Sequence, residues 1–289
     1  MSTTAIVLIA IAAVAHASWN LFSKQAAAAG TIAFVWMLTA LGTVIYAPLL
    51  AAVLAVTHPH LRALAWLFLA GTALLHVGYF LTLQRGYTAG DLSLVYPLSR
   101  GSGLLLSSFV AIPLYAEHPG PAGLAGILLI SGGVIVLSLP DRARPGLARC
   151  GPALAFGLLT GVFIAGYTLW DKYAVANLHV PPLLEEMAAG AGVAVVLAPL
   201  AMRDTGRLAL LWRRYRGQVL GAAILSPLAY LLVLTALVFS PVSSIAPARE
   251  ISVLVGVALG RRLLGEQNLG RRLAAAAAIA AGVAAIVAG

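Results

Sequence analysis

Long apolar runs separated by short polar connectors dominate the sequence. A helix needs about 20 mostly apolar residues to cross the hydrocarbon core of a membrane, and ten runs reach roughly that length. No run alternates between apolar and polar residues with period two, so the pattern predicts helices and not strands. The ten predicted spans cover residues 4–25, 32–56, 61–83, 92–114, 121–139, 152–173, 183–202, 219–239, 242–264 and 273–287.

Proline and glycine mark the connectors between these runs. Both residues interrupt helices, and they recur in segments 58–60, 117–120, 140–145 and 240–241. We therefore expect an all-α integral membrane protein with short turns between neighbouring helices. Small side chains at Gly132, Gly133 and the alanine-rich segment 274–285 predict that the fifth and tenth spans pack closely against other helices.

The composition agrees with this pattern. Of 289 residues, 61% are hydrophobic and 9% are charged, values that predict a multi-pass protein of the cytoplasmic membrane. A net charge of +9 would indicate a nucleic-acid partner in a soluble protein. Here the basic residues lie between apolar runs, where they orient the chain, so no nucleic acid is expected. Cys150 is the only cysteine, and we expect no internal disulfide, metal site or cofactor.

The basic residues are distributed unequally between the two sides of the predicted bundle. Most of the 18 Lys and Arg residues fall in odd-numbered connectors, and basic connectors tend to remain cytoplasmic. This distribution predicts that both termini lie outside. The first run has no basic segment before it and continues past any small-residue cleavage point, which disfavours a removable signal peptide.

The two halves of the sequence resemble each other at an offset of about 150 residues. Segment 19–26 aligns with 167–174, and segment 114–118 aligns with 263–267. Because each half would contain five spans, the second half enters the membrane from the opposite side. Inverted repeats with a substrate site near the midplane are a recurring design of secondary transporters. The predicted organisation is a first five-helix repeat at 1–140, a basic connector at 141–150 and an inverted second repeat at 151–289.

Charged residues lie inside two apolar runs, each shortly after a proline. Arg100 follows Pro97 in the fourth run, and Arg249 and Glu250 follow Pro247 in the ninth. An ionisable residue within the membrane is costly unless it faces a partner or a water-filled cavity, which makes it a functional candidate. We expect both prolines to bend their helices, Glu250 to pair with Arg100, and Arg249 to face the substrate. The alternative is a static buried network that fixes helix register.

Polar and aromatic side chains at helical spacing extend this candidate site. His16, Asn20 and Lys24 form one stripe on the first helix, which either faces the bundle interior or joins helices by hydrogen bonds, with Lys24 reaching the interface. His76 either shuttles protons or lies in a helix interface. Glu250 and His16 are the candidates for proton coupling. The expected substrate-binding residues are Asn20, His76, Tyr79, Tyr96, Arg100, Tyr167, Tyr230, Arg249 and Glu250.

Four other charged residues near the middle of the chain receive no functional role. Asp171 and Lys172 lie near the end of the sixth run, which predicts a surface ion pair, with the mouth of a cavity as the alternative for Asp171. Glu185 and Glu186 follow two prolines and fit the first turn of the seventh helix, where carboxylates stabilise the positive helix end.

Short motifs recur in a fixed order along the chain and again in its second half. They are Trp19, Asn20 and Lys24 at the end of the first run, Tyr96 and Pro97 in the fourth, the Glu-containing turn at 115–119, Gly126, Gly132 and Gly133 in the fifth, and a second copy from Pro247 through Glu266 to Gly282. Together they make the whole chain resemble an EamA-type transporter of the drug/metabolite transporter superfamily. The resemblance implies ten helices in two inverted five-helix units, a central cavity walled mainly by spans 1, 3, 4, 6, 8 and 9, and spans 5 and 10 packed behind it.

The resemblance also implies alternating-access movement of small metabolites, commonly the export of amino acids or related compounds. Members of the family are usually drawn with both termini in the cytoplasm, whereas the basic residues here indicate that both termini lie outside. The direction of transport, import or export, is therefore left open. Two arginines against one carboxylate predict an anionic or zwitterionic substrate. The expected partners are a small-molecule substrate, the lipid bilayer and, if transport is proton-coupled, protons. The chain is expected to act as a monomer or a homodimer. The alternatives are a facilitative channel or uniporter-like permease, or a membrane-embedded transferase, which needs clustered acidic motifs that the sequence lacks.

Overall fold

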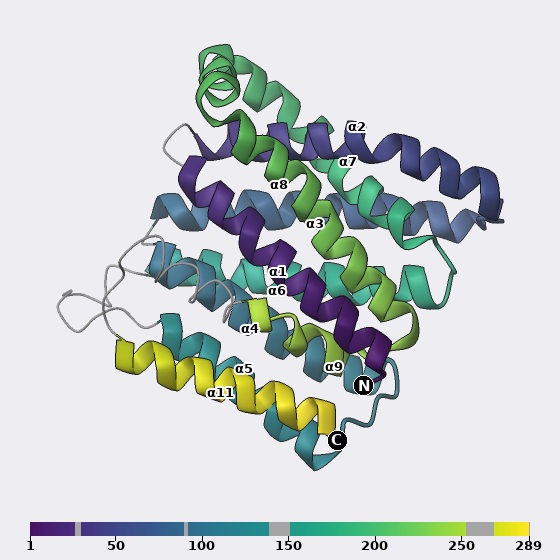
Figure 1. The fold of residues 1–289 in the computed structure, drawn as a ribbon, viewed down its shortest axis with the longest axis vertical. Coiled ribbons are helices and arrows are strands. Elements are labelled where there is room, and N and C mark those ends of the chain that lie inside the picture. The colour runs from purple at the N-terminus through teal and green to yellow at the C-terminus, as the bar shows by residue number, and fades with distance from the viewer. Residues whose placement is uncertain (27–29, 90–91, 139–150, 253–268, 289) are drawn as a thin grey trace. The chain divides into compact units, whose positions relative to one another are not determined.

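Helices make up all the regular structure of the residues that the computed structural model describes, which are 1–26, 30–89, 92–138, 151–252 and 269–288 (Figure 1). The predicted all-helical class is confirmed. The helices are α1 (Thr3–Ala26), α2 (Thr31–Thr57), α3 (Ala63–Ala89), α4 (Leu92–Leu114), α5 (Gly120–Ser138), α6 (Gly151–Ala176), α7 (Pro182–Ala201), a 3₁₀ helix (Met202–Asp204), α8 (Thr205–Phe239), α9 (Val242–Ala248) and α11 (Leu269–Ala288).

Five stretches of the described residues are long and apolar enough to cross a membrane, judged by length and composition. The last of them combines α7 and α8. Shorter apolar segments lie in α4, α5 and α11. These features are those of a helical membrane protein. The five stretches are Thr3–Ser23, Thr31–Thr57, Ala63–Gly86, Gly151–Ala176 and Pro182–Phe239.

The apolar runs predict most helix boundaries well. α4 begins at Leu92 and ends at Leu114, as expected, and α1, α2, α5, α6 and α7 agree with their predicted spans to within a few residues. α3 continues beyond its predicted end to Ala89. The ninth predicted span begins as α9 at Val242, but its residues 253–264 lie outside the described residues.

α8 begins well before the predicted start of the eighth span, because the basic connector is itself helical. Leu208, Leu211 and Tyr215 recur at helical spacing among the arginines and pack against Phe34 of α2. The backbone leaves helical geometry at Tyr215, with φ −127° and ψ 22°, so α8 consists of two helical segments joined at a kink. An apolar stripe inside a strongly basic segment therefore formed a helix that average hydrophobicity did not reveal.

The predicted turns at 58–60, 117–120 and 240–241 are confirmed. α2 ends where His58 adopts the left-handed conformation, with φ 40°, directly before a proline. Ala116 and Gly120, with φ 51° and 65°, flank the turn between α4 and α5. Pro241 immediately precedes α9. The predicted turn at 140–145 lies outside the described residues.

The chain divides into two compact units, and each takes segments from both halves of the sequence. Unit 1 consists of Met1–Ala10, Gly78–Leu169 and Phe239–Gly289, and unit 2 consists of Ile11–Val77 and Trp170–Val238. The division falls within α1, α3 and α6. The predicted boundary between two sequential repeats, at 141–150, lies outside the described residues, so the two inverted repeats stay a prediction.

In unit 1, α5 and α11 lie side by side (Figure 1). Gly126 and Gly282 make this approach possible, since a Cβ atom on either glycine would lie 2.6 or 2.7 Å from the carbonyl oxygen of the other. A Cβ on Gly133 would lie 2.9 Å from the Ala275 carbonyl, which confirms its predicted role in close packing. The same prediction is wrong for Gly132, because nothing lies within 4 Å of a Cβ there.

In unit 2, α2 packs along α7, and aromatic rings fix α3 against the end of α6. The Phe68 ring stacks on Trp170 with centroids 4.1 Å apart, and the Trp170 Nε1 donates a 2.8 Å hydrogen bond to the Phe68 carbonyl oxygen. Gly71, one turn later on α3, leaves the space that the indole ring occupies. This packing holds the polar side chains of α3 and α6 next to one another.

Candidate functional site

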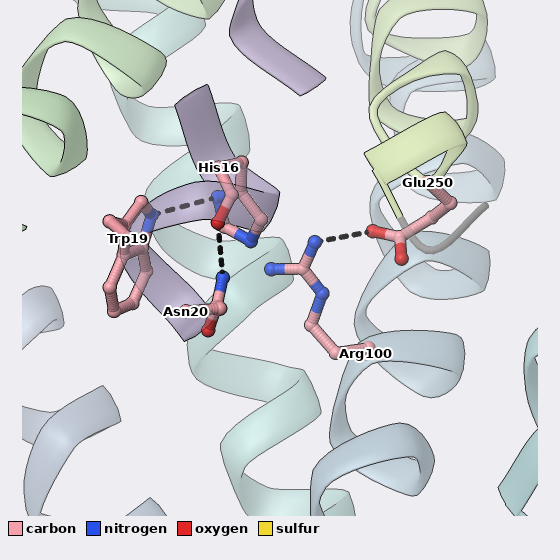
Figure 2. A network of polar contacts seen from close by, with 5 residues as sticks. All are labelled: His16, Trp19, Asn20, Arg100 and Glu250. Carbon is pink, nitrogen blue, oxygen red and sulfur yellow. Dashed lines mark hydrogen bonds and ion pairs between the residues drawn. The ribbon is translucent and has the colours of Figure 1, made fainter. Parts of the chain in front are cut away.

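A buried ion pair connects α4 to the segment that follows α9. The Arg100 Nη2 donates a hydrogen bond of 2.8 Å to the Glu250 Oε1 (Figure 2). Arg100 is 7% exposed and Glu250 is 3% exposed. The contact predicted between these two residues is therefore confirmed. A guanidinium and a carboxylate removed from water stabilise each other only in close contact, since either one alone would remain buried and unpaired.

The α-helical hydrogen bonding of α9 ends just before Glu250. α9 runs from Val242 to Ala248, and the amide of Glu250 donates to the Pro247 carbonyl oxygen at 2.9 Å, an i to i−3 bond. Proline has no N–H group and its ring clashes with the preceding turn, whereas this change follows Pro247, which lies within α9, so the predicted bend at Pro247 stays a prediction. α4 continues through Pro97, whose predicted bend stays a prediction.

Glu117 holds the beginning of α9 in place. Its Oε1 accepts a 2.7 Å hydrogen bond from the Val242 amide, and its Oε2 accepts a 2.8 Å bond from the Ser243 amide. The first amides of a helix have no partner within the helix, and a carboxylate there also interacts favourably with the helix dipole. Glu117, which is buried, therefore positions the helix that leads to Glu250. The sequence identified it only as part of a turn.

Arg249 lies at the C-terminal end of α9. Its amide donates to the Ile245 carbonyl oxygen at 3.1 Å, and the residue is half-buried. Arg249 and Glu250 are neighbours in the turn, but Arg249 is half-buried whereas Glu250 is buried. Arg249 stays a candidate for substrate contact.

The predicted aromatic residues separate into different groups. Tyr79 and Tyr167 lie edge to face in unit 1, with ring centroids 5.8 Å apart. Tyr230 lies in unit 2, where its ring approaches that of His76 at 5.7 Å. His76 and Tyr79 are neighbours on α3, yet each has its partner in a different unit. The side chain of Tyr96 lies outside the described residues.

The polar stripe of α1 is bonded within its own helix. The Asn20 amide donates to the His16 carbonyl oxygen at 2.7 Å, and the Trp19 indole donates to the His16 Nδ1 at 3.3 Å (Figure 2). Both Asn20 and His16 are half-buried. Substrate contact by Asn20 and proton coupling by His16 stay predictions. The Lys24 side chain lies outside the described residues.

Asp171 is a buried residue, so the predicted surface pair with Lys172 is wrong. Its exposed fraction is 0%, and its Oδ2 accepts a 2.6 Å hydrogen bond from the Tyr230 hydroxyl. The Lys172 Nζ instead donates to the Leu237 carbonyl oxygen at 2.6 Å. The physical reason is that α6 continues past Asp171 to Ala176 and is covered there by α3 and α8.

Further polar groups surround Asp171 in unit 2. The Thr72 hydroxyl and the His76 ring of α3 face it, and the carboxyl of Glu185 on α7 lies beside it. The His76 Nδ1 lies 2.9 Å from the Thr72 carbonyl oxygen. Glu185 is in the first turn of α7 as predicted, but it is 0% exposed. Sequence reasoning missed this cluster, because nothing in the sequence reports which helix faces meet.

Comparison with solved structures shows the same fold in other chains. Among solved structures, 28 chains match this one. One of them, described as a crystal structure of a protein, has a TM-score of 0.72 and 14% sequence identity to this chain. The superposition covers 97% of this chain and 98% of the other. No family model matches the sequence, and no curated protein sequence matches it. At this level of identity, the similarity concerns the fold alone.

Proposed function

We propose that the chain is a secondary transporter of the EamA type, in the drug/metabolite transporter superfamily. In this proposal it moves a small polar metabolite across the cytoplasmic membrane by alternating access. The buried Arg100–Glu250 pair, with its 2.8 Å contact, is the observation that carries the proposal. Charges in membrane-spanning helices are costly and are characteristic of substrate and ion pathways.

The interrupted ninth span supports the same function. Secondary transporters commonly bind substrates where a helix is broken near the midplane, because the break supplies backbone groups and places side chains at the cavity. Here α9 ends at Ala248, and Arg249 and Glu250 form the turn that follows it. Glu117 fixes the start of that short helix, which limits the positions that Glu250 can take.

The proposed architecture has ten spans in two inverted five-helix repeats. Most predicted spans coincide with helices, and α5 and α11, the fifth and tenth in the prediction, pack together. The first repeat would cover 1–140 and the second 151–289. Asn20, Tyr79, Tyr96, Tyr167 and the two arginines would line the substrate path between them.

The proposed substrate is anionic or zwitterionic, of amino-acid or organic-acid type. Arg100 and Arg249 supply two positive charges near one carboxylate, Glu250. A guanidinium offers paired N–H donors that match a carboxylate, and Glu250 would interact with the ammonium group of a zwitterion.

Reconstitution into proteoliposomes tests this function. A screen of thermal stability against amino acids, organic acids and phosphorylated metabolites identifies a ligand, because a ligand that binds only the folded state raises the unfolding temperature. Uptake of the radiolabelled ligand should then saturate and follow an imposed gradient. Passive conductance that does not saturate would instead identify a channel, and the absence of transport for every stabilising ligand would refute the proposal.

A further inference from the structure

Two carboxyl groups meet in the interior of unit 2, on α6 and α7. Asp171 and Glu185 are both 0% exposed, and their carboxyls lie side by side. The Tyr230 hydroxyl donates to the Asp171 Oδ2 at 2.6 Å. Among the described residues, the Asp171 Oδ1 and both Glu185 oxygens have no hydrogen-bond partner.

Two neighbouring carboxylates removed from water cannot both keep a full negative charge at neutral pH without strong repulsion. A single proton on Glu185 removes that repulsion. It also supplies the missing donor, because the new O–H group can donate to the Asp171 Oδ1 while Tyr230 continues to donate to the Oδ2. The pair then carries one negative charge and one shared proton.

Charged or titratable groups near the pair come from α3, α6, α7 and α8. His76 on α3 faces Asp171, Tyr230 comes from α8, and Glu186 follows Glu185 on α7. Lys172 follows Asp171 on α6 and donates to the Leu237 carbonyl oxygen. The His76 Nδ1 lies against the Thr72 carbonyl oxygen, which can only accept a hydrogen bond. The same Nδ1 lies 3.1 Å from the Thr72 hydroxyl, so two oxygen atoms of Thr72 hold this titratable ring in place.

A small, mostly apolar cavity lies next to the second glutamate, Glu186. Its volume is about 30 Å³, enough for a water molecule. Glu186 lines it together with the hydroxyls of Thr39, Thr43 and Ser226. Glu186 is half-buried whereas Glu185 is fully buried, so a carboxyl with access to water adjoins the enclosed pair.

We propose that Asp171 and Glu185 form a proton-binding site that holds one proton between them, and that exchange of this proton drives the transporter. The second part rests on the proposed function. Release of the proton leaves two negative charges facing each other across α6 and α7, which favours separation of those helices. Uptake of the proton restores the bridge. The coupling site is then this pair, in place of Glu250 or His16.

Infrared difference spectroscopy of the purified full chain in lipid tests the site without any transport assay. A protonated carboxyl gives a C=O stretching band that an ionised carboxylate lacks, and the band shifts in D₂O. We expect the wild type to show this band at neutral pH and to lose it on alkaline titration. Glu185→Gln should remove it, whereas Asp171→Asn should shift its frequency, because the buried Glu185 stays protonated but loses the carboxylate that accepts its hydrogen bond. Asp204→Asn, at an exposed surface pair, should leave it unchanged.

Folding of each variant is checked by its thermal unfolding transition. If a variant fails to fold, Tyr230→Phe provides the second test: it keeps both carboxyls but removes the donor to Asp171, and we expect it to shift the alkaline titration of the band. A wild-type spectrum without the band at neutral pH would overturn the proton site. So would a band that survives unchanged in folded Glu185→Gln.

Transport then tests the coupling separately. In proteoliposomes, a pH gradient should accelerate uptake of the ligand found by the stability screen, and Glu185→Gln should abolish that acceleration while a Na⁺ gradient has no effect. Uptake that is saturable but indifferent to pH would refute coupling and leave the proposed function intact. Absence of any uptake, with the infrared band present, would refute the proposed function and leave the proton site.

Discussion

The guanidinium of Arg100 donates a 2.8 Å hydrogen bond to the carboxylate of Glu250, and the two residues stand 150 positions apart in the chain. Both side chains are buried, at 8% and 4% exposure. Removal of one partner of a buried ion pair typically costs about 3–5 kcal/mol, because the other charge is left without compensation.

We therefore predict that Arg100→Gln and Glu250→Gln each destabilise the fold by a few kcal/mol, on the order of the 3–5 kcal/mol above. The double variant should cost less than the sum of the two, since it leaves no unpaired charge. Thermal unfolding in detergent measures all three. Asp204→Asn is the matched control, because the Asp204–Arg207 pair is half-exposed and surface pairs contribute about 0–1 kcal/mol. Additive effects of Arg100→Gln and Glu250→Gln would contradict the pairing.

The second prediction concerns the start of α9. Glu117→Ala removes the acceptor for the amides of Val242 and Ser243 and should destabilise the protein by about 1–3 kcal/mol, the range for a lost bond to a charged group. Hydrogen exchange at these two amides should become faster. The neighbouring exposed residue provides the control, so His118→Gln should leave both the stability and the exchange rates unchanged.

Adjacent glycines of α5 provide a third prediction. Gly133→Ala places a methyl group 2.9 Å from the Ala275 carbonyl oxygen, and overpacking of this kind costs about 1–3 kcal/mol. Gly132→Ala meets nothing within 4 Å, so the change should be neutral or stabilise the helix by up to about 1 kcal/mol. Unfolding temperatures of the two variants should therefore move in different directions. Equal destabilisation would contradict the described packing of α5 on α11.

Tyr230→Phe tests the hydrogen bond to Asp171. The substitution keeps the ring that approaches His76 but removes the hydroxyl that lies 2.6 Å from the Asp171 Oδ2. We expect a loss of about 1.5–3 kcal/mol in unfolding free energy, because the acceptor belongs to a charged or proton-sharing carboxyl. Tyr173→Phe is the control: its ring stacks on Phe68, and the substitution preserves that ring. A smaller effect for Tyr230→Phe than for Tyr173→Phe would contradict this assignment.

Arg249→Ala tests the proposed substrate contact. If its guanidinium binds a substrate carboxylate, saturable uptake into proteoliposomes should weaken about ten-fold or more, since a hydrogen bond to a charged group contributes about 1.5–3 kcal/mol. Arg249→Lys should recover part of the loss. Arg207→Ala is the control, because Arg207 lies in an exposed surface pair. Unchanged uptake rate and affinity in Arg249→Ala would remove the proposed role of this residue.

Much of the helical organisation could be predicted from the sequence, because membrane helices follow the lengths of apolar runs. α4 agrees with its run at both ends, and the pairing of Arg100 with Glu250 is the one that their positions within apolar runs predicted. The start of α8 could not be predicted in this way, since its first segment buries only one narrow apolar stripe among arginines.

The pair of Asp171 and Glu185 shows why the buried polar cluster of unit 2 could not be predicted from the sequence. Asp171 stands near the end of an apolar run and Glu185 near the beginning of another, and both positions are typical of exposed charges. The packing of α3 and α8 on α6, through Trp170 and Tyr230, covers Asp171, and Glu185 is buried beside it. Such contacts depend on which helix faces meet, and helical spacing within one segment does not determine that.

The reciprocal approach of Gly126 and Gly282 has a consequence for biosynthesis. A ribosome completes α5 well before it begins α11, so the glycine-lined face of α5 enters the bilayer without the helix that later covers it. During that interval, lipid or a membrane chaperone must occupy the face. Unit 1 therefore reaches its final packing only after translation of α11, and in a nascent chain arrested before Leu269 this face of α5 should still react with a lipid-soluble cross-linker.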